Sequence, residues 1–384
     1  MEEVASRSRV VANEVANERA SASASAPELA VIVPTLNEAD NIDVLVAALT
    51  RALKDHAYEI VFVDDWSTDG TPDAIASLAA ARPDIRLIRR YGRRGLSSAV
   101  IEGALATIAP VIAVIDADMQ HDERLLPALL ARVQTGEADI AIGSRYVDGG
   151  SFGAWDASRV RSSQIATRLA RRLLRSPVAD PMSGFFVVRR SALLAALPHL
   201  SNMGFKILLD LLASSPTPLR AIELPFEFRT RHAGQSKLDS GVAIEFLLML
   251  LDKSVGRWLP PRLVLFGAVG VLGLAVHLAI LRTAMLLGAR FTVAQTIAVL
   301  TAIAFNFTLN NALTYRDRRL RGRAFLPGLL SFYAVCGLGA LANIGAGQFV
   351  FAREHRWWLA GIAGAAVGSL WNFAASSVTT WRKR

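Results

Sequence analysis

The feature that most restricts the fold is a set of four apolar blocks in the C-terminal third of the chain. They cover about residues 262–287, 292–314, 325–351 and 357–379. Each block is long enough for the roughly 20 residues that a helix needs to cross a bilayer. Only structures that satisfy every backbone polar group internally can span hydrocarbon, so these blocks are expected to be helices. The sequence therefore predicts a four-helix all-α transmembrane domain over residues 261–384.

Arginine in the loops between the blocks predicts their orientation. A run of arginines fills the middle loop, and Arg382, Lys383 and Arg384 end the chain, whereas the two outer loops carry less positive charge. Positively charged loops tend to remain in the cytoplasm. We therefore expect a multi-pass protein of the inner or cell membrane, with the middle loop, both termini and the preceding domain on the cytoplasmic side.

The overall composition narrows the class of partner. The chain has 384 residues, of which 52% are hydrophobic and 20% charged, and a formal net charge of +9. A basic balance suits nucleic acid, an anionic membrane surface or a phosphorylated substrate. Because the arginine clusters flank the apolar blocks, the last two are favoured and no nucleic-acid partner is expected. Cys336 lies inside an apolar block, so neither a disulfide framework nor a Cys/His metal site is predicted.

Residues 28–240 alternate short apolar runs with stretches of helical periodicity. The runs lie at residues 29–33, 58–63, 85–89, 111–115 and 139–143. Such runs are typical of buried parallel strands. Strands that alternate with helices predict an α/β domain with a mostly parallel, Rossmann-like sheet.

Two segments flank this domain. Residues 1–27 end in a run of serine and alanine, and we expect a disordered tail there. Residues 241–260 are apolar on one side and charged on the other. This pattern suits a helix in the membrane interface, and an ordinary amphipathic core helix is the alternative.

Acidic residues follow three of the predicted strands. They are Glu38, the pair Asp64-Asp65, and Asp116 with Asp118. Parallel strands deliver their carboxyl ends to one edge of a sheet, which is where ligands bind. Solvated loop acids would explain Asp116 and Asp118 equally well in isolation, but three strands that end in this way favour a binding site.

The stretch after residues 111–115 carries the donors of a metal site. Alternation along an extended chain would place Asp116, Asp118 and Gln120 on one side. Oxygen donors suit a hard divalent cation. We therefore predict that these three residues hold Mg²⁺ or Mn²⁺, with a substrate diphosphate completing the coordination shell.

Seven motifs in this domain together resemble the dolichol-phosphate (polyprenol-phosphate) mannosyltransferases. In chain order they are Pro34-Thr-Leu-Asn-Glu38, Asp64-Asp65 with Ser67-Thr-Asp-Gly-Thr71, Asp116-Ala-Asp-Met-Gln120, Gly143-Ser-Arg-Tyr146, Asp180-Pro-Met-Ser-Gly-Phe185, Gly204-Phe-Lys-Ile-Leu-Leu209 and Arg231…Gly234-Gln-Ser-Lys237. Those enzymes belong to glycosyltransferase family 2 and have a GT-A fold. The apolar remainder resembles the GtrA-like membrane domain that is often joined to them. One departure is Trp66, where many relatives carry a small or polar residue.

The resemblance implies a reaction and a set of contacts. The reaction is metal-dependent transfer of mannose from GDP-mannose to a polyprenyl or dolichyl monophosphate, with inversion at the sugar. The residues implied around the nucleotide sugar are Pro34, Glu38, Asp64, Asp65, Asp116, Arg231 and Lys237. For Glu38, the alternative is an interaction with the dipole of the helix that follows it.

The acceptor phosphate is already anionic at neutral pH, so it needs positioning and charge compensation rather than a general base. Arginine matches phosphate with its planar fork. We expect Arg145, with Ser144 beside it, and Arg159 to bind this phosphate, and Asp118, Arg145 and Arg159 to be the catalytic residues. A surface ion pair is the alternative for Arg145, and neighbouring arginines on the same helix are alternatives to Arg159.

Two other functions remain compatible with the residues. The same mechanism could use UDP-glucose or another sugar nucleotide, because the sequence does not identify the base and sugar contacts. A protein of another class, a lipid-linked sugar transporter or a scaffold that only binds nucleotide, would exploit the polar residues within the apolar blocks. The intact motif from Asp116 to Gln120 favours the enzyme. Glycines in the apolar blocks permit close helix contacts, so a homo-oligomer is also possible.

Overall fold

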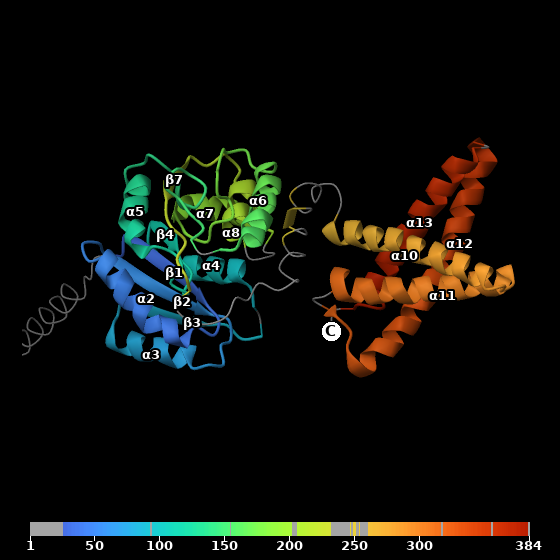
Figure 1. Ribbon diagram of the computed structural model, residues 1–384, viewed down its shortest axis with the longest axis horizontal. Coiled ribbons are helices and arrows are strands. Elements are labelled where there is room, and N and C mark those ends of the chain that lie inside the picture. The colour runs from blue at the N-terminus through green and yellow to red at the C-terminus, as the bar shows by residue number, and fades with distance from the viewer. Residues whose placement is uncertain are drawn as a thin grey trace, which may run out of the picture. The chain divides into compact units, whose positions relative to one another are not determined.

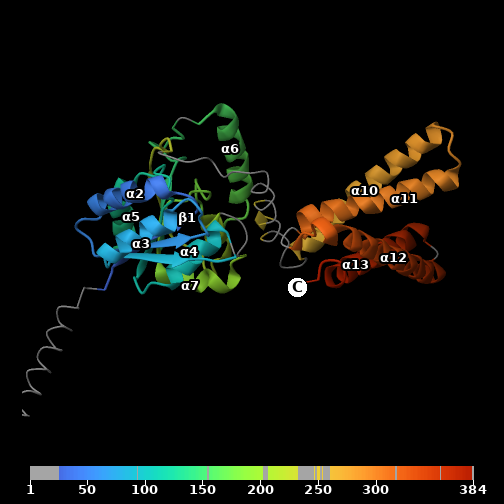
Figure 2. The same ribbon diagram turned by 90° about the horizontal axis from the view of Figure 1, so that it is seen from below.

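The computed structural model describes residues 26–92, 94–153, 155–201, 206–231, 260–315, 318–354 and 356–382, together with 246, 249–250 and 253. Lys237, nearly all of the predicted tail and most of the predicted interface helix lie outside these residues. The chain divides into two compact units between Ser254 and Val255, and each is described by itself (Figures 1 and 2).

The first unit is built on a seven-stranded sheet (Figure 1). Its strands are β1 (Leu29–Thr35), β2 (Tyr58–Asp64), β3 (Ile85–Arg89), β4 (Val111–Val114), β5 (Ile140–Ser144), β6 (Phe186–Arg189) and β7 (Ala221–Pro225). Their order is β3-β2-β1-β4-β6-β5-β7. Only β6 runs antiparallel to its neighbours in this sheet. The predicted mostly parallel α/β fold is confirmed.

Helices cover both faces of the sheet (Figure 2). One face packs against α2 (Ala39–Ala52), α3 (Thr71–Ala81) and α5 (Leu126–Gln134), the last preceded by a 3-10 turn over Glu123–Leu125. The other face packs against α4 (Leu96–Leu105), α7 (Arg190–Ala196) and α8 (Ile207–Ser214). A further helix, α6 (Ala157–Arg171), follows β5.

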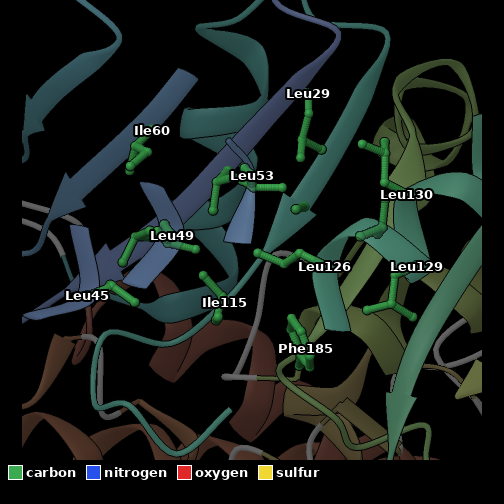
Figure 3. Packing of buried hydrophobic residues seen from close by; sticks show 14 of the residues in the cluster. Leu29, Leu45, Leu49, Leu53, Ile60, Ile115, Leu126, Leu129, Leu130 and Phe185 are labelled. Atoms are coloured by element: carbon green, nitrogen blue, oxygen red, sulfur yellow. The ribbon is translucent and has the colours of Figure 1, made fainter. Parts of the chain in front are cut away.

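The apolar sequence of β1 follows from this two-sided cover. Leu29, Val31 and Val33 belong to the core under α2 and α5, whereas Ala30 and Ile32 belong to the core under α4. All five side chains are fully buried. Strands covered on both faces lose the apolar–polar alternation of half-exposed strands. Figure 3 shows the first of these cores, where leucines of α2 and α5 meet the sheet beside Phe185.

The second unit is helical. Its helices are α10 (Pro261–Leu286), α11 (Phe291–Leu309), a short π-helical continuation (Asn310–Thr314), a 3-10 turn (Gly322–Ala324), α12 (Phe325–Glu354) and α13 (Trp357–Val378). Three stretches of the described residues are long and apolar enough to cross a membrane: Arg262–Leu286, Val293–Thr314 and Gly322–Glu354. The fourth predicted span coincides with α13. Helix α10 packs mainly on α11, and α12 on α13.

Gly103 lies where α4 packs against β1 and β2, and it gives a test of the packing. A Cβ at this position would lie 2.6 Å from Cγ2 of Ile32 and 2.9 Å from Cγ2 of Val63, both on buried branched side chains. We predict that Gly103→Ala lowers the free energy of unfolding by about 1–3 kcal/mol, since an overfilled core must shift to accept the methyl group. Thermal unfolding of the full chain in detergent measures this loss.

The matched control is Gly270→Ala in α10, where an added Cβ meets nothing within 4 Å. It should leave the unfolding temperature of the first unit unchanged. A Gly103→Ala protein as stable as this control would contradict the close packing of α4 on β1 and β2.

Candidate functional site

The predicted site residues that the structure describes lie near one edge of the sheet. Every strand except β6 runs in the same direction, so the segments after β1, β2, β4 and β5 leave at a shared edge. Three non-glycine residues on these segments have positive φ: Asn37 (52°), Trp66 (63°) and Met119 (64°). Such backbone strain is uncommon and clusters at functional sites.

The segment after β4 does not follow the extended path predicted from the sequence. Strand β4 ends at Val114, and the left-handed conformation of Met119 turns the chain between Asp118 and Gln120. The backbone N–H of Gln120 donates to Oδ1 of Asp118 at 3.1 Å. The expected alternation is therefore wrong here, and a tight turn brings Asp118 and Gln120 together instead.

The Gln120 amide is held from behind by the segment that follows β7. Its Nε2 donates to the backbone oxygen of Arg229 at 3.0 Å, and the N–H of Arg229 donates to the backbone oxygen of Gln120 at 2.9 Å. Arg229 also pairs with Glu123 at 2.8 Å and with Asp122. The Oε1 atom of Gln120 accepts instead from Nη2 of Arg231, the atom that also pairs with Asp118.

Arg231 connects three of the loops at this edge. Its Nη2 lies 2.8 Å from Oδ2 of Asp118 and donates to Oε1 of Gln120 at 3.5 Å, while its Nη1 lies 3.9 Å from Oε1 of Glu38. Glu38 also accepts from Nδ2 of Asn41 at 2.7 Å. The predicted set Glu38, Asp118, Gln120 and Arg231 is thus one group in space, although it spans nearly the whole first unit in sequence.

Asp116 lies beside a buried histidine. Its N–H donates to Nδ1 of His121 at 3.3 Å, and its Oδ2 is 3.8 Å from Nε2 of the same ring. Burial raises the pKa of Asp116 to about 6, although Lys206 and Arg231 act in the opposite direction. Burial lowers the pKa of His121 to about 4. Near pH 7 the imidazole is therefore neutral.

Arg145 is paired within the protein. Its Nε and Nη2 donate to the two carboxylate oxygens of Asp180 at 2.7 and 2.9 Å, and both side chains are almost completely buried. Rings of Phe152, Trp155 and Phe228 surround the guanidinium, with centroids between 5.6 and 5.7 Å away. The fork expected to bind phosphate is thus held by Asp180, and Ser144 beside it is fully buried.

Arg159, on α6, faces the same region. Its guanidinium lies over the Trp155 ring, 3.9 Å from the centroid. Burial and the nearby Arg231 lower its pKa. Within the described part of the chain, its buried Nε has no hydrogen-bond partner. Arg159 is therefore better placed than Arg145 to offer donors to an anion.

The two acids after β2 organise loops. Asp64 accepts from the N–H and the hydroxyl of Ser67, and Asp65 accepts from Nη1 of Arg90 at 2.6 Å and from the N–H of Gly95 at 2.7 Å. Burial raises the pKa of Asp65 despite these contacts. Pro34 lies opposite Val63 near the end of β1. These residues shape the loops at the site edge, and their predicted contacts with nucleotide remain predictions.

Lys206 is the site residue that the sequence did not single out. Its Nζ donates to the backbone oxygen of Met182 at 2.9 Å, and its charge acts on both Asp116 and Asp180. Burial and the nearby Arg145 lower its pKa to about 8. It belongs to the motif Gly204-Phe-Lys-Ile-Leu-Leu209, but the surrounding leucines gave no sign that it faces the acids.

The donors at this edge suit a divalent cation. Asp116, Asp118 and the oriented oxygen of Gln120 are hard oxygen ligands of the kind that Mg²⁺ and Mn²⁺ prefer. No group of three or more His, Cys, Asp or Glu side chains with metal-site geometry occurs among the described residues.

Comparisons with known proteins match both parts of the chain. Residues 30–195 match the family model described as glycosyl transferase family 2, and residues 265–381 match the one described as GtrA/DPMS, transmembrane domain. A dolichol-phosphate mannosyltransferase of Pyrococcus furiosus is 36% identical over 318 residues, which are 82% of this chain and 88% of that protein. A dolichol-phosphate mannosyltransferase of Saccharomyces cerevisiae is 35% identical over 248 residues, covering 62% and 91%.

A bacterial relative and a solved structure are more distant. An undecaprenyl-phosphate mannosyltransferase of Micrococcus luteus is 31% identical over 232 residues, covering 59% of this chain and 92% of that protein. The crystal structure of glucosyl-3-phosphoglycerate synthase from Mycobacterium tuberculosis covers 59% of this chain and 80% of its own, with 19% identity and a TM-score of 0.44.

The raised pKa of Asp116 predicts that its ionised carboxylate destabilises the folded chain near pH 7 when no ligand is bound. The folded chain holds this proton more tightly than the unfolded chain, whose pKa is near 3.8. The stability that the group contributes is present below about pH 4 and is lost as the pH rises through about 6. Asp116→Asn removes the charge of this half-buried side chain, so it should unfold at a higher temperature than wild type at pH 7 in EDTA.

The advantage of Asp116→Asn should disappear below about pH 4. Thermal unfolding measured from pH 4 to pH 8 checks the whole profile. Asp43→Asn, at an exposed position of α2, is the control for removing a charge. If the unfolding temperature of Asp116→Asn exceeded that of wild type by the same amount at every pH, the raised pKa of Asp116 would be contradicted.

Proposed function

Because the chain belongs to glycosyltransferase family 2, in the dolichol-phosphate mannosyltransferase group with a GtrA-type membrane domain, we propose that it makes polyprenyl-phosphate-mannose. The donor is GDP-mannose and the acceptor a polyprenyl or dolichyl monophosphate. The catalytic domain lies in the cytoplasm, on the side of the arginine-rich loop between α11 and α12.

One observation carries the proposal: acids and cations from distant segments converge where strands β1, β4 and β5 end. Asp116 and Asp118 lie among Arg145, Arg159, Lys206 and Arg231, and the charges of these residues influence one another. A nucleotide sugar and a lipid phosphate bring at least three phosphate groups to one place. Such anions need several cations and, at the acids, a bridging metal ion.

For the donor, we propose that Asp116, Asp118 and Gln120 hold Mg²⁺ or Mn²⁺. When bound, the ion acts as a Lewis acid that neutralises the diphosphate leaving group. Arg231 contacts both Asp118 and Glu38, so it can turn toward the diphosphate while Glu38 faces the nucleoside. Pro34, Asp64 and Asp65 shape the nucleoside pocket, and Lys237 provides a further cation.

For the acceptor, we propose that a phosphate oxygen of the lipid attacks the anomeric carbon of the sugar. The new C–O bond forms as the bond to the diphosphate breaks, GDP leaves, and no proton is transferred. The attack comes from the face opposite the leaving group, so the configuration inverts. Arg159 binds the phosphate directly, while the paired Arg145 beside Ser144 contributes its positive charge.

Helix α6 supports a lipid acceptor in particular. The helix carries Arg159, no acidic residue between Ala157 and Arg171, and two exposed apolar side chains, Ile165 (58%) and Leu169 (39%). Arginines interleaved with exposed apolar residues suit the boundary between headgroups and acyl chains. A water-soluble acceptor would not require this surface.

A donor panel tests the proposal. The purified full chain is incubated with a short polyprenyl phosphate and labelled GDP-mannose, UDP-glucose, UDP-galactose or GDP-fucose, with Mg²⁺, Mn²⁺ or EDTA. We expect mannose transfer from GDP-mannose only, lost in EDTA, with release of GDP. Asp118→Asn should reduce the rate at least about 100-fold, because the leaving diphosphate loses its counter-ion.

Each other outcome has a definite meaning. Transfer from UDP-glucose alone would overturn the mannosyl assignment but keep the mechanism. Full activity in EDTA, or in Asp118→Asn, would overturn the metal assignment. Binding of GDP-mannose without transfer to any polyprenyl phosphate would replace the enzyme with a nucleotide-binding membrane protein.

A further inference from the structure

We propose that His121 is a positioning residue that holds the Asp116 carboxylate in the geometry needed to bind a divalent cation. The proposal rests on the metal site of the proposed function. It stands on three sets of contacts: those that fix the imidazole ring, those that join it to Asp116, and the close approach of Gly184.

Aromatic side chains fix the ring of His121. It stacks on Phe185 with centroids 5.3 Å apart and an angle of 14° between planes, and it meets the edges of Phe226 and Phe228 at 5.7 Å. Only 3% of the residue is exposed. The ring therefore lies in an apolar box. Within the part of the chain that the structure describes, the hydrogen bond of this ring and its carboxylate contact within 4 Å are both with Asp116.

The hydrogen bond from the Asp116 backbone sets the tautomer of the ring. A backbone N–H can only donate, so Nδ1 of His121 must accept with its lone pair. In a neutral imidazole the proton is then on Nε2. That atom lies 3.8 Å from Oδ2 of Asp116, within reach of a small movement of the carboxylate. One ring therefore directs both the backbone and the side chain of Asp116.

Gly184 approaches both the Asp116 carboxylate and the His121 ring. A Cβ on Gly184 would lie 2.9 Å from Oδ2 of Asp116 and 3.3 Å from Cε1 of His121. A side chain at position 184 would therefore collide with the Asp116 carboxylate and crowd the imidazole ring, so Gly184 leaves room for both groups. Neighbours that orient a metal ligand commonly contribute 10–100-fold to metal affinity.

Three substitutions separate positioning from packing. His121→Phe keeps an aromatic ring in the box but removes both nitrogens. His121→Asn can reproduce the acceptor at Nδ1, and His121→Gln the donor at Nε2. The control is His56→Phe, since His56 pairs with Glu28 away from the site edge.

Two measurements on the full chain in detergent report on the proposal. Electron paramagnetic resonance of free Mn²⁺ gives the metal affinity, and hydrogen exchange by mass spectrometry gives the protection of the Asp116 amide. We expect His121→Phe to weaken Mn²⁺ binding about 10–100-fold and to speed exchange at Asp116. His121→Asn should restore the protection, His121→Gln part of the affinity, and His56→Phe should match wild type.

The outcomes distinguish this proposal from the proposed function. His121→Phe with wild-type Mn²⁺ affinity and wild-type exchange would show that the ring only fills space, and would overturn the proposal. If the wild type itself binds no Mn²⁺, the metal assignment fails. In that case the positioning of Asp116 still stands or falls on whether His121→Phe loses, and His121→Asn keeps, the protection of the Asp116 amide.

The membrane unit supports a second, independent proposal. Its two hairpins, α10–α11 and α12–α13, carry matching residues at one constant offset in sequence. The matched pairs, identical except for the last, are Phe266/Phe332, Val269/Val335, Leu272/Leu338, Gly273/Gly339, Arg290/Arg356, Asn306/Asn372, Phe307/Phe373, Thr314/Thr380 and Tyr315/Trp381.

The matching residues make matching contacts inside each hairpin. The Asn306 amide lies against the Cα of Gly273, where an added Cβ would overlap it, and the Asn372 amide lies in the same way against Gly339. In the described residues, the buried side-chain oxygen of each of these asparagines has no hydrogen-bond partner. Each hairpin is therefore closed by the same pairing of asparagine with glycine.

Between the hairpins the contacts are reciprocal. Phe266 meets Phe373 with centroids 5.7 Å apart, and Phe332 meets Phe307 at 5.8 Å. Tyr315 shares a hydrogen bond with Ser377 at 2.6 Å, and Trp381 donates to Asn311, the counterpart of Ser377, at 3.1 Å.

Reciprocal contacts of this kind arise from a twofold axis. The rings of Tyr315 and Trp381 stack on each other at 4.1 Å. We infer that the membrane unit is a tandem repeat of one helical hairpin, related by a pseudo-twofold axis that passes between these rings. Each repeat contains two helices, so the chain returns to the side on which the repeat began. The first helices of the two repeats therefore run in the same direction, and the axis runs along the helices.

Quasi-equivalence of the two glycines tests the repeat. Gly273→Ala and Gly339→Ala should lower the unfolding temperature of the membrane unit by similar amounts, and Asn306→Gly and Asn372→Gly should each rescue only the substitution in its own hairpin. Gly337→Ala, where an added Cβ meets nothing, is the control. Unequal losses, or rescue across hairpins as strong as rescue within one, would overturn the proposal.

Discussion

The buried pair of Arg145 and Asp180 is the interaction on which the site depends. Asp180 accepts from Nε, Nη2 and the backbone N–H of Arg145, and its own N–H donates to Glu223 on β7 at 2.8 Å. This arrangement joins the end of β5, the segment before β6 and the edge strand β7. Loss of one member would leave the other charge buried alone, which typically costs about 3–5 kcal/mol. The pair therefore ties these three segments together near Asp116 and Lys206, and it holds a positive charge there without exposing it to water.

The site combines charges that a stable core would avoid. Burial raises the pKa of Asp116 and Asp118 and lowers that of Lys206, so it favours the neutral form of each group. Neighbouring opposite charges only partly offset these shifts. Three loops also contain a non-glycine residue in the left-handed region. Proteins retain such strain at functional sites, where ligand binding offsets its cost in free energy. Here the ligands would be a diphosphate, a metal ion and a lipid phosphate, which together neutralise both signs of charge. The apolar cores on both faces of the sheet stabilise the fold and offset the unfavourable charges and backbone strain at this edge.

From the sequence, the acids were expected at one edge of the sheet, but the contacts between individual side chains were not predicted. Glu38, Asp118, Gln120 and Arg231 lie together as expected because parallel strands must bring their carboxyl ends to one edge. The partner of Arg145 was not predicted, since Asp180 and Arg145 are distant in sequence and carry no pattern that links them. Lys206 was missed for a similar reason: in a helix-like run of leucines, nothing local shows which way a lysine faces. The turn at Met119 was also missed, because a methionine at positive φ has no sequence signal.

What the sequence determined by itself is the periodicity and the placement of chemistry. Apolar runs of strand length predicted a parallel sheet, apolar blocks of membrane length predicted helices, and the acids at strand ends favoured a site at one edge. Those features depend on local physics: backbone hydrogen bonding, side-chain alternation and the cost of burying polar groups. Only the tertiary structure showed that Arg145 is paired with Asp180, whereas Nε of Arg159 has no hydrogen-bond partner among the described residues. It also showed that aromatic rings hold His121 against Asp116, and that the two membrane hairpins repeat each other's contacts. These depend on distances between residues far apart in the chain, and packing sets those distances only when the whole fold has formed.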